Sequence, residues 1–186
     1  MIIGLNGLMG VGKSTAANFI TAYSASPTKL IKFAAPLYDI QEFAYRRIKS
    51  VFNRPDDFVK DRKLLQWLGT EWGRGTINDN IWVDIWENEV REAVKQGFTV
   101  ICDDVRFDNE AETVLSLGGI VLNIASSQSL TRITTANGIV AHASEAGIAS
   151  NYISHRVENN GTEKEFDHKL RSLLFVAGVK LLALPK

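Results

Sequence analysis

The chain of 186 residues carries 21 basic and 21 acidic side chains, so its formal net charge is zero. This balance lacks the basic excess of a nucleic-acid-binding domain, so we expect small nucleotides rather than nucleic acid as partners. The single cysteine, Cys102, excludes an intramolecular disulfide, which fits a reducing cytoplasm, and its apolar surroundings predict a buried small hydrophobe. No signal peptide and no bilayer-spanning apolar run is evident, so we expect a cytoplasmic protein without a membrane partner.

The first elements predicted along the chain are a strand, a glycine loop and a helix. Residues 1–5 are a short apolar run typical of a strand, and residues 13–23 have the apolar spacing of a helix. Between them, residues 7–15 read Gly-Leu-Met-Gly-Val-Gly-Lys-Ser-Thr and fit the phosphate-binding pattern G-x-x-x-x-G-K-[ST]. The pattern in this context predicts a nucleotide-phosphate site. A plain glycine turn before a helix is the alternative.

In such a loop, backbone N–H groups and the helix N-terminus hold the phosphates. Lys13 would reach the β- and γ-phosphates, and the Ser14 hydroxyl would bind Mg²⁺. The predicted cofactor-binding residues are Gly7, Met9, Gly10, Val11, Gly12, Lys13, Ser14 and Thr15.

The middle of the chain predicts a short strand followed by helices. Residues 29–33 are a strand candidate, and Pro36 opens a helix with an apolar face at helical spacing. That face comprises Leu37, Ile40, Ala44, Ile48 and Val51. A helix from residue 60 to 72 runs into residues 69–75, a glycine-rich stretch that suits a binding loop or an interrupted helix. Residues 81–95 predict another amphipathic helix.

The last third of the chain continues the alternation of strand and helix. Residues 98–102 are an almost unbroken apolar run, as in a parallel strand covered on both faces. Residues 126–151 are poor in large apolar side chains and resemble a lid. The other predicted elements are a helix over 109–117, strands over 120–124 and 152–157, and a long helix over 163–184. The alternation predicts an α/β fold with a parallel sheet, whose strand ends bring residues 7–15, 33–36 and 103–106 to one edge.

Two acids follow the third predicted strand, where many nucleotide sites hold Mg²⁺ directly or through water. Asp103 and Asp104 compete for this role, and a plain turn is the alternative for either. Arg74, Arg106 and Arg132 are candidate phosphate ligands, because phosphoryl transfer needs charge neutralisation. Taken singly, each arginine also fits a solvated surface position, and Arg106 would then pair with Glu110.

Four tryptophans offer a stacking surface for a base. Trp67 and Trp86 fit helix cores, whereas Trp72 and Trp82 border the glycine-rich stretch and are the better stacking candidates. The guanine-reading pattern Asn-Lys-x-Asp is absent from the sequence, which argues against a switch GTPase.

Several segments together resemble the phage-type deoxynucleoside monophosphate kinases, which are P-loop kinases distantly similar to phosphomevalonate kinase. The segments are residues 7–15, 33–37, 64–71 with 73–74, 79 with 82–83, 104–107 with 109–110, 142–145 and 159–162. They keep the family's order over nearly the whole chain. Ala35, Tyr38 and Ala143 depart from its pattern, which often has an acid, a lysine and a proline there.

The resemblance implies transfer of the ATP γ-phosphoryl group to a deoxynucleoside monophosphate (dNMP), with ATP and Mg²⁺ as cofactors. It implies a three-layer P-loop fold with a five-stranded parallel sheet, helices on both faces and a small lid. It also implies one kinase domain over residues 1–186, with an acceptor-binding helical region at about 36–97 and the lid at about 126–151. If the chain is phage-encoded, its location is the host cytoplasm.

The same resemblance assigns residues to roles. Catalytic roles fall on Lys13, Asp104, Arg106 and Arg132, and metal binding on Ser14 and Asp104. Substrate contacts fall on Phe33, Gln66, Arg74, Trp82, Arg106 and Glu110. Related kinases make a homodimer plausible. Two other functions stay open: a P-loop kinase for another phosphorylated acceptor, and an ATP-binding regulatory or assembly module.

Overall fold

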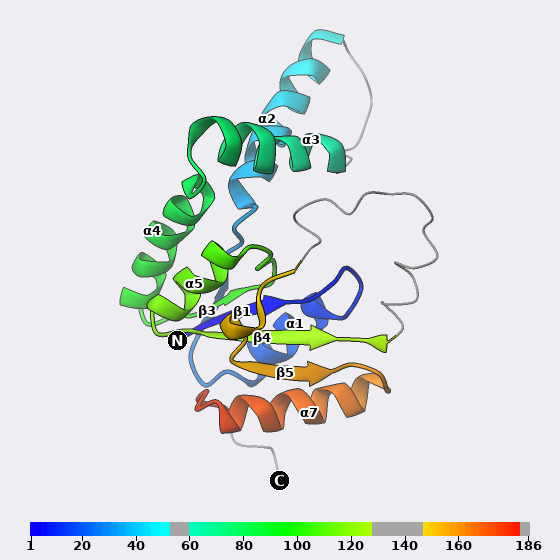
Figure 1. Ribbon diagram of the computed structural model, residues 1–186, viewed down its shortest axis with the longest axis vertical. Coiled ribbons are helices and arrows are strands. Elements are labelled where there is room, and N and C mark those ends of the chain that lie inside the picture. Colours follow the sequence, from blue (N-terminus) through cyan, green and yellow to red (C-terminus); the bar gives the residue numbers. More distant parts are fainter. Residues whose placement is uncertain (53–59, 128–146, 183–186) are drawn as a thin grey trace.

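The computed structural model describes residues 1–52, 60–127 and 147–182, and Figure 1 shows their arrangement. Five strands form one sheet in the order β2-β3-β1-β4-β5. The strands are β1 (Ile2–Asn6), β2 (Thr28–Leu30), β3 (Thr99–Cys102), β4 (Ile120–Ala125) and β5 (His155–Glu158). Every pairing in the sheet is parallel, which confirms the predicted parallel five-stranded sheet.

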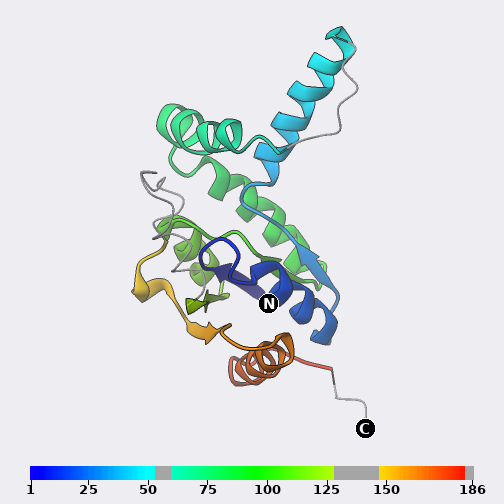
Figure 2. The same ribbon diagram turned by 90° about the vertical axis from the view of Figure 1, so that its right-hand side faces the viewer.

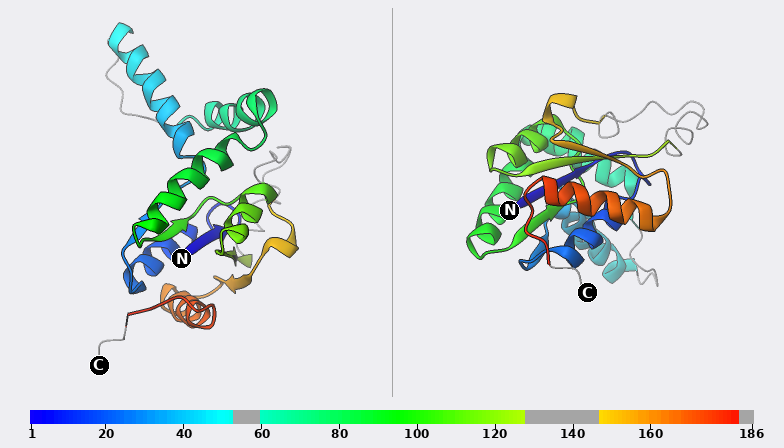
Figure 3. Two further views of the ribbon diagram at one scale, coloured as in Figure 1. Left: turned by 90° about the vertical axis from the view of Figure 1, so that its left-hand side faces the viewer. Right: turned by 90° about the horizontal axis from the view of Figure 1, so that it is seen from below.

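Helices cover both faces of this sheet (Figures 1 and 3). One layer holds α1 (Lys13–Tyr23) and α7 (Glu163–Val176), and the other holds α4 (Ile81–Lys95) and α5 (Asp108–Ser116). Residues of β1 alternate between the layers: Ile3 and Leu5 pack with α1 and α7, whereas Ile2 packs with α4 and α5. This three-layer arrangement confirms the predicted fold class. Cys102 is buried in it, as the sequence predicted.

Further helices project away from the sheet (Figures 1 and 2). They are α2 (Ala35–Phe52), α3 (Arg62–Trp67) and the wide π-type helix η1 (Leu68–Ile77). The predicted apolar face of α2 is right at Leu37, which is buried, and wrong further along, because Ile48 is 50% and Val51 67% exposed. Figures 1 and 2 show the second half of α2 extending past the other described elements, so within the described ranges its apolar side chains have no layer to cover.

The glycine-rich stretch 69–75 lies within helix η1, so the expectation of an interrupted helix is confirmed and the alternative of a binding loop is wrong. Gly73 lies against the indole of Trp82, and a Cβ atom there would be 2.3 Å from the ring. The Trp82 Nε1–H donates to the Gly69 carbonyl at 2.8 Å. The glycines therefore let η1 approach α4 closely, and the widened helical turns satisfy the backbone.

Three element boundaries differ from the predictions. Strand β2 ends at Leu30 rather than 33, because the Asp104 carboxylate accepts the N–H groups of Phe33 and Ala34 at 3.1 and 3.0 Å. The last helix ends at Val176 rather than 184, because Gly178 has a left-handed backbone (φ 74°) just past its end. Strand β5 begins at His155 rather than 152, after the short 3₁₀ helix η3 (Ser150–Tyr152).

Among the described residues, no helix combines the length and the apolar character needed to cross a bilayer.

Candidate functional site

Three loops meet at the carboxyl edge of the sheet, as the strand order requires. The Ser14 hydroxyl lies 3.4 Å from Asp103 Oδ2, which joins the glycine loop to the end of β3. Asp104 holds the backbone of Phe33 and Ala34, which joins the same strand end to the loop after β2. The prediction that these segments converge is confirmed. Because β3 and β4 lie on opposite sides of β1, the site occupies the point where the strand order reverses.

The glycine loop has a backbone that only glycine adopts easily. Gly7, Gly10 and Gly12 have φ values of 142°, 81° and 101°. A Cβ at Gly7 would lie 2.3 Å from the Ile124 carbonyl oxygen, and one at Gly12 would lie 2.6 Å from Asn159 Nδ2. The loop therefore has the tight, glycine-dependent curvature that a phosphate cradle requires.

Asn159 braces this loop from the end of β5. Its Nδ2 donates to the Val11 carbonyl oxygen at 2.9 Å. The candidate site residues predicted from the sequence do not include Asn159. Its only signal is an amide side chain directly after a strand, within a segment that resembles the kinase family.

Lys13 lies across the glycine loop. Its Nζ donates to the carbonyl oxygens of Gly7 and Leu8 at 2.6 and 2.8 Å. The ammonium group of Lys13 therefore lies inside the curve of the glycine loop. Helix α1 begins here with Gly12 in the N-cap position and no side-chain cap, so its first N–H groups face the same centre.

The two acids after β3 point in different directions. Asp103 faces Ser14 and also Lys32, whose Nζ lies 3.0 Å from Oδ1 and 3.2 Å from Oδ2. Asp104 instead holds the loop after β2 and accepts the Cys102 thiol at 3.1 Å. The geometry thus places Asp103, not the expected Asp104, beside Ser14. Consecutive residues of an extended chain point to opposite sides, so one position decides which acid faces the glycine loop.

Burial shapes the ionisation of this strand end. Burial raises the pKa of Asp104 above its ordinary value, although the N–H groups of Ala34 and Phe33 and the Cys102 thiol offset part of the effect. For Lys32, burial lowers the pKa, but the hydrogen bond and charge of Asp103 outweigh it, so the net pKa is raised. Lys32 is therefore a firmly protonated partner of Asp103.

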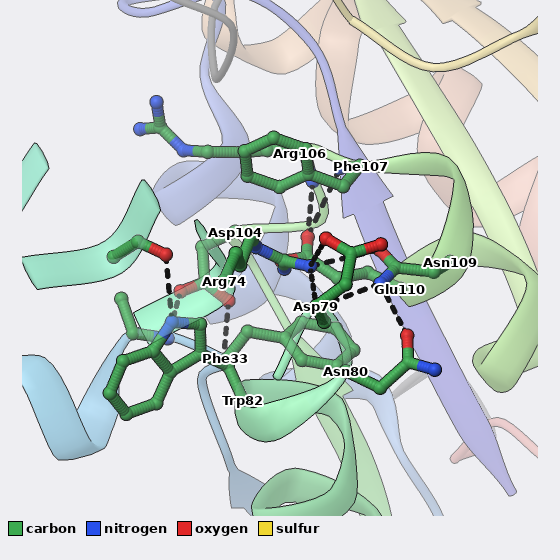
Figure 4. A network of polar contacts seen from close by, with 12 residues as sticks. Phe33, Arg74, Asp79, Asn80, Trp82, Asp104, Arg106, Phe107, Asn109 and Glu110 are labelled. Carbon is green, nitrogen blue, oxygen red and sulfur yellow. Dashed lines mark hydrogen bonds and ion pairs between the residues drawn. The ribbon is translucent and has the colours of Figure 1, made fainter. Parts of the chain in front are cut away.

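A buried polar network lies beside the acids (Figure 4). Arg74 Nη2 lies 2.6 Å from Glu110 Oε1, and Arg74 Nη1 donates to the Asp79 carbonyl oxygen at 2.7 Å. The Arg74 guanidinium also lies 4.2 Å from the centre of the Phe107 ring. Glu110 Oε2 accepts the N–H groups of Arg106 and Phe107 at 2.7 and 3.2 Å. One carboxylate thus joins η1 to the backbone that carries Arg106.

The environment of Glu110 raises its pKa from 4.5 to about 7. Burial is the main cause, and the charge of Asp104 adds to it. The N–H of Arg106 and the charge of Arg74 act in the opposite direction and do not fully compensate.

Arg106 and Arg74 have different surroundings. In Figure 4 the Arg106 side chain extends away from the Glu110 carboxylate, whereas the Arg74 guanidinium faces it. The sequence predicted that both arginines converge on one phosphate. The geometry instead commits Arg74 to a buried ion pair, and Arg106 lines the cavities described next.

Two cavities open at this edge. One of about 380 Å³ lies between α2, α3, η1 and the loop after β3. All the predicted substrate-binding residues line it: Phe33, Gln66, Arg74, Trp82, Arg106 and Glu110. The other, of about 300 Å³, is lined by Gly7, Val11 and the ends of β4 and β5. Met9 and Arg106 line both cavities.

Some predicted site residues lie outside the described residues, and two tryptophans differ in exposure from what the sequence predicted. Arg132 and most of the lid segment 126–151 fall outside the described residues. Trp82, a stacking candidate, is only 4% exposed, because its indole packs on Gly73. Trp67, expected in a helix core, is 51% exposed.

The family model for deoxynucleotide monophosphate kinase matches residues 38–170. The chain is 32% identical over 107 residues to the deoxynucleoside-5′-monophosphate kinase of Escherichia phage T5, covering 55% of this chain but only 40% of that enzyme. It is 30% identical over 144 residues to a protein of Acanthamoeba polyphaga mimivirus provisionally named deoxynucleotide monophosphate kinase. This match covers 67% of this chain and 73% of the mimivirus protein.

Among solved structures, a sugar kinase from Janibacter sp. HTCC2649 is similar over 96% of this chain and 94% of that one. Its TM-score is 0.51 at 10% sequence identity, so it shows a shared fold alone. The family match, by contrast, covers most of the chain, including the strand end with Asp104 and Arg106. The chain therefore belongs to the deoxynucleotide monophosphate kinase family.

Proposed function

We propose that this chain transfers the γ-phosphoryl group of ATP to a deoxynucleoside monophosphate, giving ADP and the deoxynucleoside diphosphate. A phosphate oxygen of the acceptor attacks the γ-phosphorus, and the bond to the β–γ bridging oxygen breaks. The observation that carries the proposal is that two cavities adjoin and share Met9 and Arg106. Transfer between two nucleotides needs their phosphates to meet at one point, and Arg106, which lines both cavities, would lie at that point.

The donor side rests on the glycine loop. Its curvature leaves room for phosphate oxygens, and Lys13 would neutralise the β- and γ-phosphates. Ser14 and Asp103 offer two oxygens for Mg²⁺ or its waters. In the described ranges no three His, Cys, Asp or Glu side chains cluster as a metal site, so the remaining oxygens would come from nucleotide and water. This donor set fits a metal that arrives with ATP.

The acceptor side is the 380 Å³ cavity. Arg106 would bind the acceptor phosphate through its planar fork, and Gln66, Trp82 and Phe33 would contact the nucleoside. Arg74 and Glu110 would hold the loop that aims Arg106. Asp104, expected to bind metal, would hold the loop after β2 that closes the same cavity. We assign the acceptor region to residues 36–97 of a single kinase domain, and the lid with Arg132 to residues 126–151.

A coupled assay for ADP release with a panel of acceptors tests the proposal. The rate of ADP release with each deoxynucleoside monophosphate should be compared with the rate with the corresponding ribonucleoside monophosphate and with phosphomevalonate. Release that depends on a deoxynucleoside monophosphate supports the kinase. Turnover indifferent to any acceptor would point instead to an ATP-binding regulatory or assembly module. Family membership favours the nucleotide acceptor over phosphomevalonate. A homodimer and a cytoplasmic location stay predictions.

A further inference from the structure

Lys32 has no role in the function derived above, yet it lies at the centre of the site. It comes two residues after the end of β2, and its Nζ contacts both carboxylate oxygens of Asp103, at 3.0 and 3.2 Å. The Asp103 side chain is 6% exposed and that of Lys32 is 35% exposed. The carboxylate is thus buried, while its ammonium partner keeps access to solvent.

The same carboxylate faces Ser14, the hydroxyl that the glycine-loop pattern assigns to Mg²⁺. Apart from the Lys32 ion pair, buried Asp103 Oδ1 accepts no hydrogen bond within the described part of the chain. A buried carboxylate without a cation is strongly unfavourable. Before a nucleotide binds, Lys32 is the cation that meets this need.

A divalent ion beside Ser14 would compete with Lys32 for the same two oxygens. At equal distance, the attraction of a carboxylate to a doubly charged ion is twice its attraction to an ammonium group. Lys32 stands on a flexible four-carbon stem with one side in solvent, so it can withdraw at little cost. Asp103 is buried at the end of β3 and stays in place.

We propose that Lys32 is a resident counter-cation of Asp103, and that the Mg²⁺ ion arriving with ATP displaces it. This inference rests on the proposed ATP site. It assigns to Lys32 a charge-balancing role: it neutralises the buried Asp103 carboxylate until the metal arrives. It also sets the affinity for the metal, because the ion must break one ion pair before it gains the carboxylate.

Calorimetric titration with ATP in EDTA and with Mg·ATP tests the exchange. The ratio of the two affinities isolates the contribution of the metal. In Lys32→Met the metal has no ion pair to break, so this ratio should rise on the order of fivefold, the equivalent of a partly exposed ion pair. Lys29→Met, at an exposed position of β2, is the matched control and should leave the ratio unchanged. An unchanged or smaller ratio in Lys32→Met would overturn the exchange.

A double substitution separates the exchange from a general effect of charge on the nucleotide. In the Asp103→Asn background there is no carboxylate for the two cations to share, so Lys32→Met should then leave the ratio unchanged. A rise that persists in this background would overturn the proposal. Failure of the wild-type chain to bind ATP in either form would contradict the proposed function itself, whereas binding with an unchanged ratio contradicts the exchange alone.

Lysine labelling of the wild-type chain keeps the test independent of the folding of any variant. Reductive methylation followed by mass spectrometry measures the reactivity of Lys32 in metal-free ATP and in Mg·ATP, with Lys29 as internal reference. Displacement should make Lys32 more reactive in Mg·ATP. Equal or lower reactivity would show that Lys32 stays on Asp103, and would overturn the proposal.

Discussion

Glu110 Oε1 lies 2.6 Å from Arg74 Nη2, and the two side chains, 4% and 6% exposed, form an ion pair buried beside the acceptor cavity. The other oxygen of Glu110 accepts the backbone N–H groups of Arg106 and Phe107. The pair therefore ties helix η1 to the loop that presents Arg106. This arrangement makes Arg74 and Glu110 positioning residues, which hold a phosphate-binding arginine without sharing its ligand.

Removing the charge of Arg74 should destabilise the fold. At pH 8, above the pKa of Glu110, Arg74→Met leaves the Glu110 carboxylate buried without its cation, which costs about 3 kcal/mol or more of unfolding free energy. Urea unfolding measures the loss. Arg46→Met removes an exposed arginine from its pair with Glu42 on α2, and should change stability by about 0.5 kcal/mol at most. Equal effects of the two substitutions would contradict the role of the buried pair.

Glu110 should make stability depend on pH. Its pKa of about 7 in the folded chain lies above the ordinary 4.5, so the folded state binds the proton more tightly than the unfolded state. The resulting stabilisation is full below pH 4.5 and is lost as the pH rises through 7. In Glu110→Gln this dependence should disappear, so between pH 5 and 7 the variant should gain on the wild type by up to about 1.4 kcal/mol per pH unit. Parallel pH profiles of the two proteins would contradict the assignment.

The parts of the site that lie in one continuous stretch could be predicted from the sequence. Residues 7–15 carry their own backbone requirement, because three glycines and a lysine at fixed spacing define both the curvature and the charge. The almost unbroken apolar run before Asp103 likewise indicates a buried parallel strand. The edge where these loops meet follows from the parallel order of the strands.

The contacts that cross the chain could not be predicted. Asp104 ends β2 by accepting hydrogen bonds from the backbone N–H groups of Phe33 and Ala34. Nothing in the sequence around these two residues indicates this contact. The three glycines of residues 69–75 left a loop and an interrupted helix equally open, and contact with the indole of Trp82 from another helix decides for the helix. Which of Asp103 and Asp104 faces the glycine loop depends on the register of the strand end, and a shift of one residue exchanges the two. Composition and spacing do not determine that register.

Lys13→Ala should remove nearly all phosphoryl transfer while the chain stays folded. The ammonium group lies over the glycine loop, where it donates to the carbonyl oxygens of Gly7 and Leu8. Without it, the charge that develops between the β- and γ-phosphates is not neutralised. Turnover in the coupled assay and an unfolding curve measure the two effects. Lys95→Ala, at an exposed position in the last turn of α4, should retain full activity. A folded Lys13→Ala protein with wild-type turnover would contradict the donor site.

The two neighbouring acids should have separable functions. Asp103→Asn should raise the Mg²⁺ concentration needed for half-maximal activity, because this carboxylate faces Ser14. Asp104→Asn should instead raise the acceptor KM, because this side chain fixes the loop of Phe33 and Ala34 at the acceptor cavity. Steady-state kinetics with Mg²⁺, ATP and acceptor varied in turn distinguish the two. A stronger Mg²⁺ defect in Asp104→Asn would restore the assignment expected from the sequence.

Arg106→Lys isolates the side-chain chemistry of the acceptor site. The backbone N–H of residue 106 is held by Glu110 whichever side chain follows, so the loop keeps its geometry in the variant. Lysine keeps the positive charge but loses the planar fork that grips two phosphate oxygens. The acceptor KM should therefore rise on the order of tenfold, equal to about 1.4 kcal/mol, and kcat should fall if the same fork aligns the attacking oxygen. The KM for ATP should change little, because the glycine loop holds that substrate separately. Arg91→Lys, on the exposed side of α4, is the matched control and should leave both KM values unchanged. A defect confined to ATP would place Arg106 on the donor side of the shared boundary.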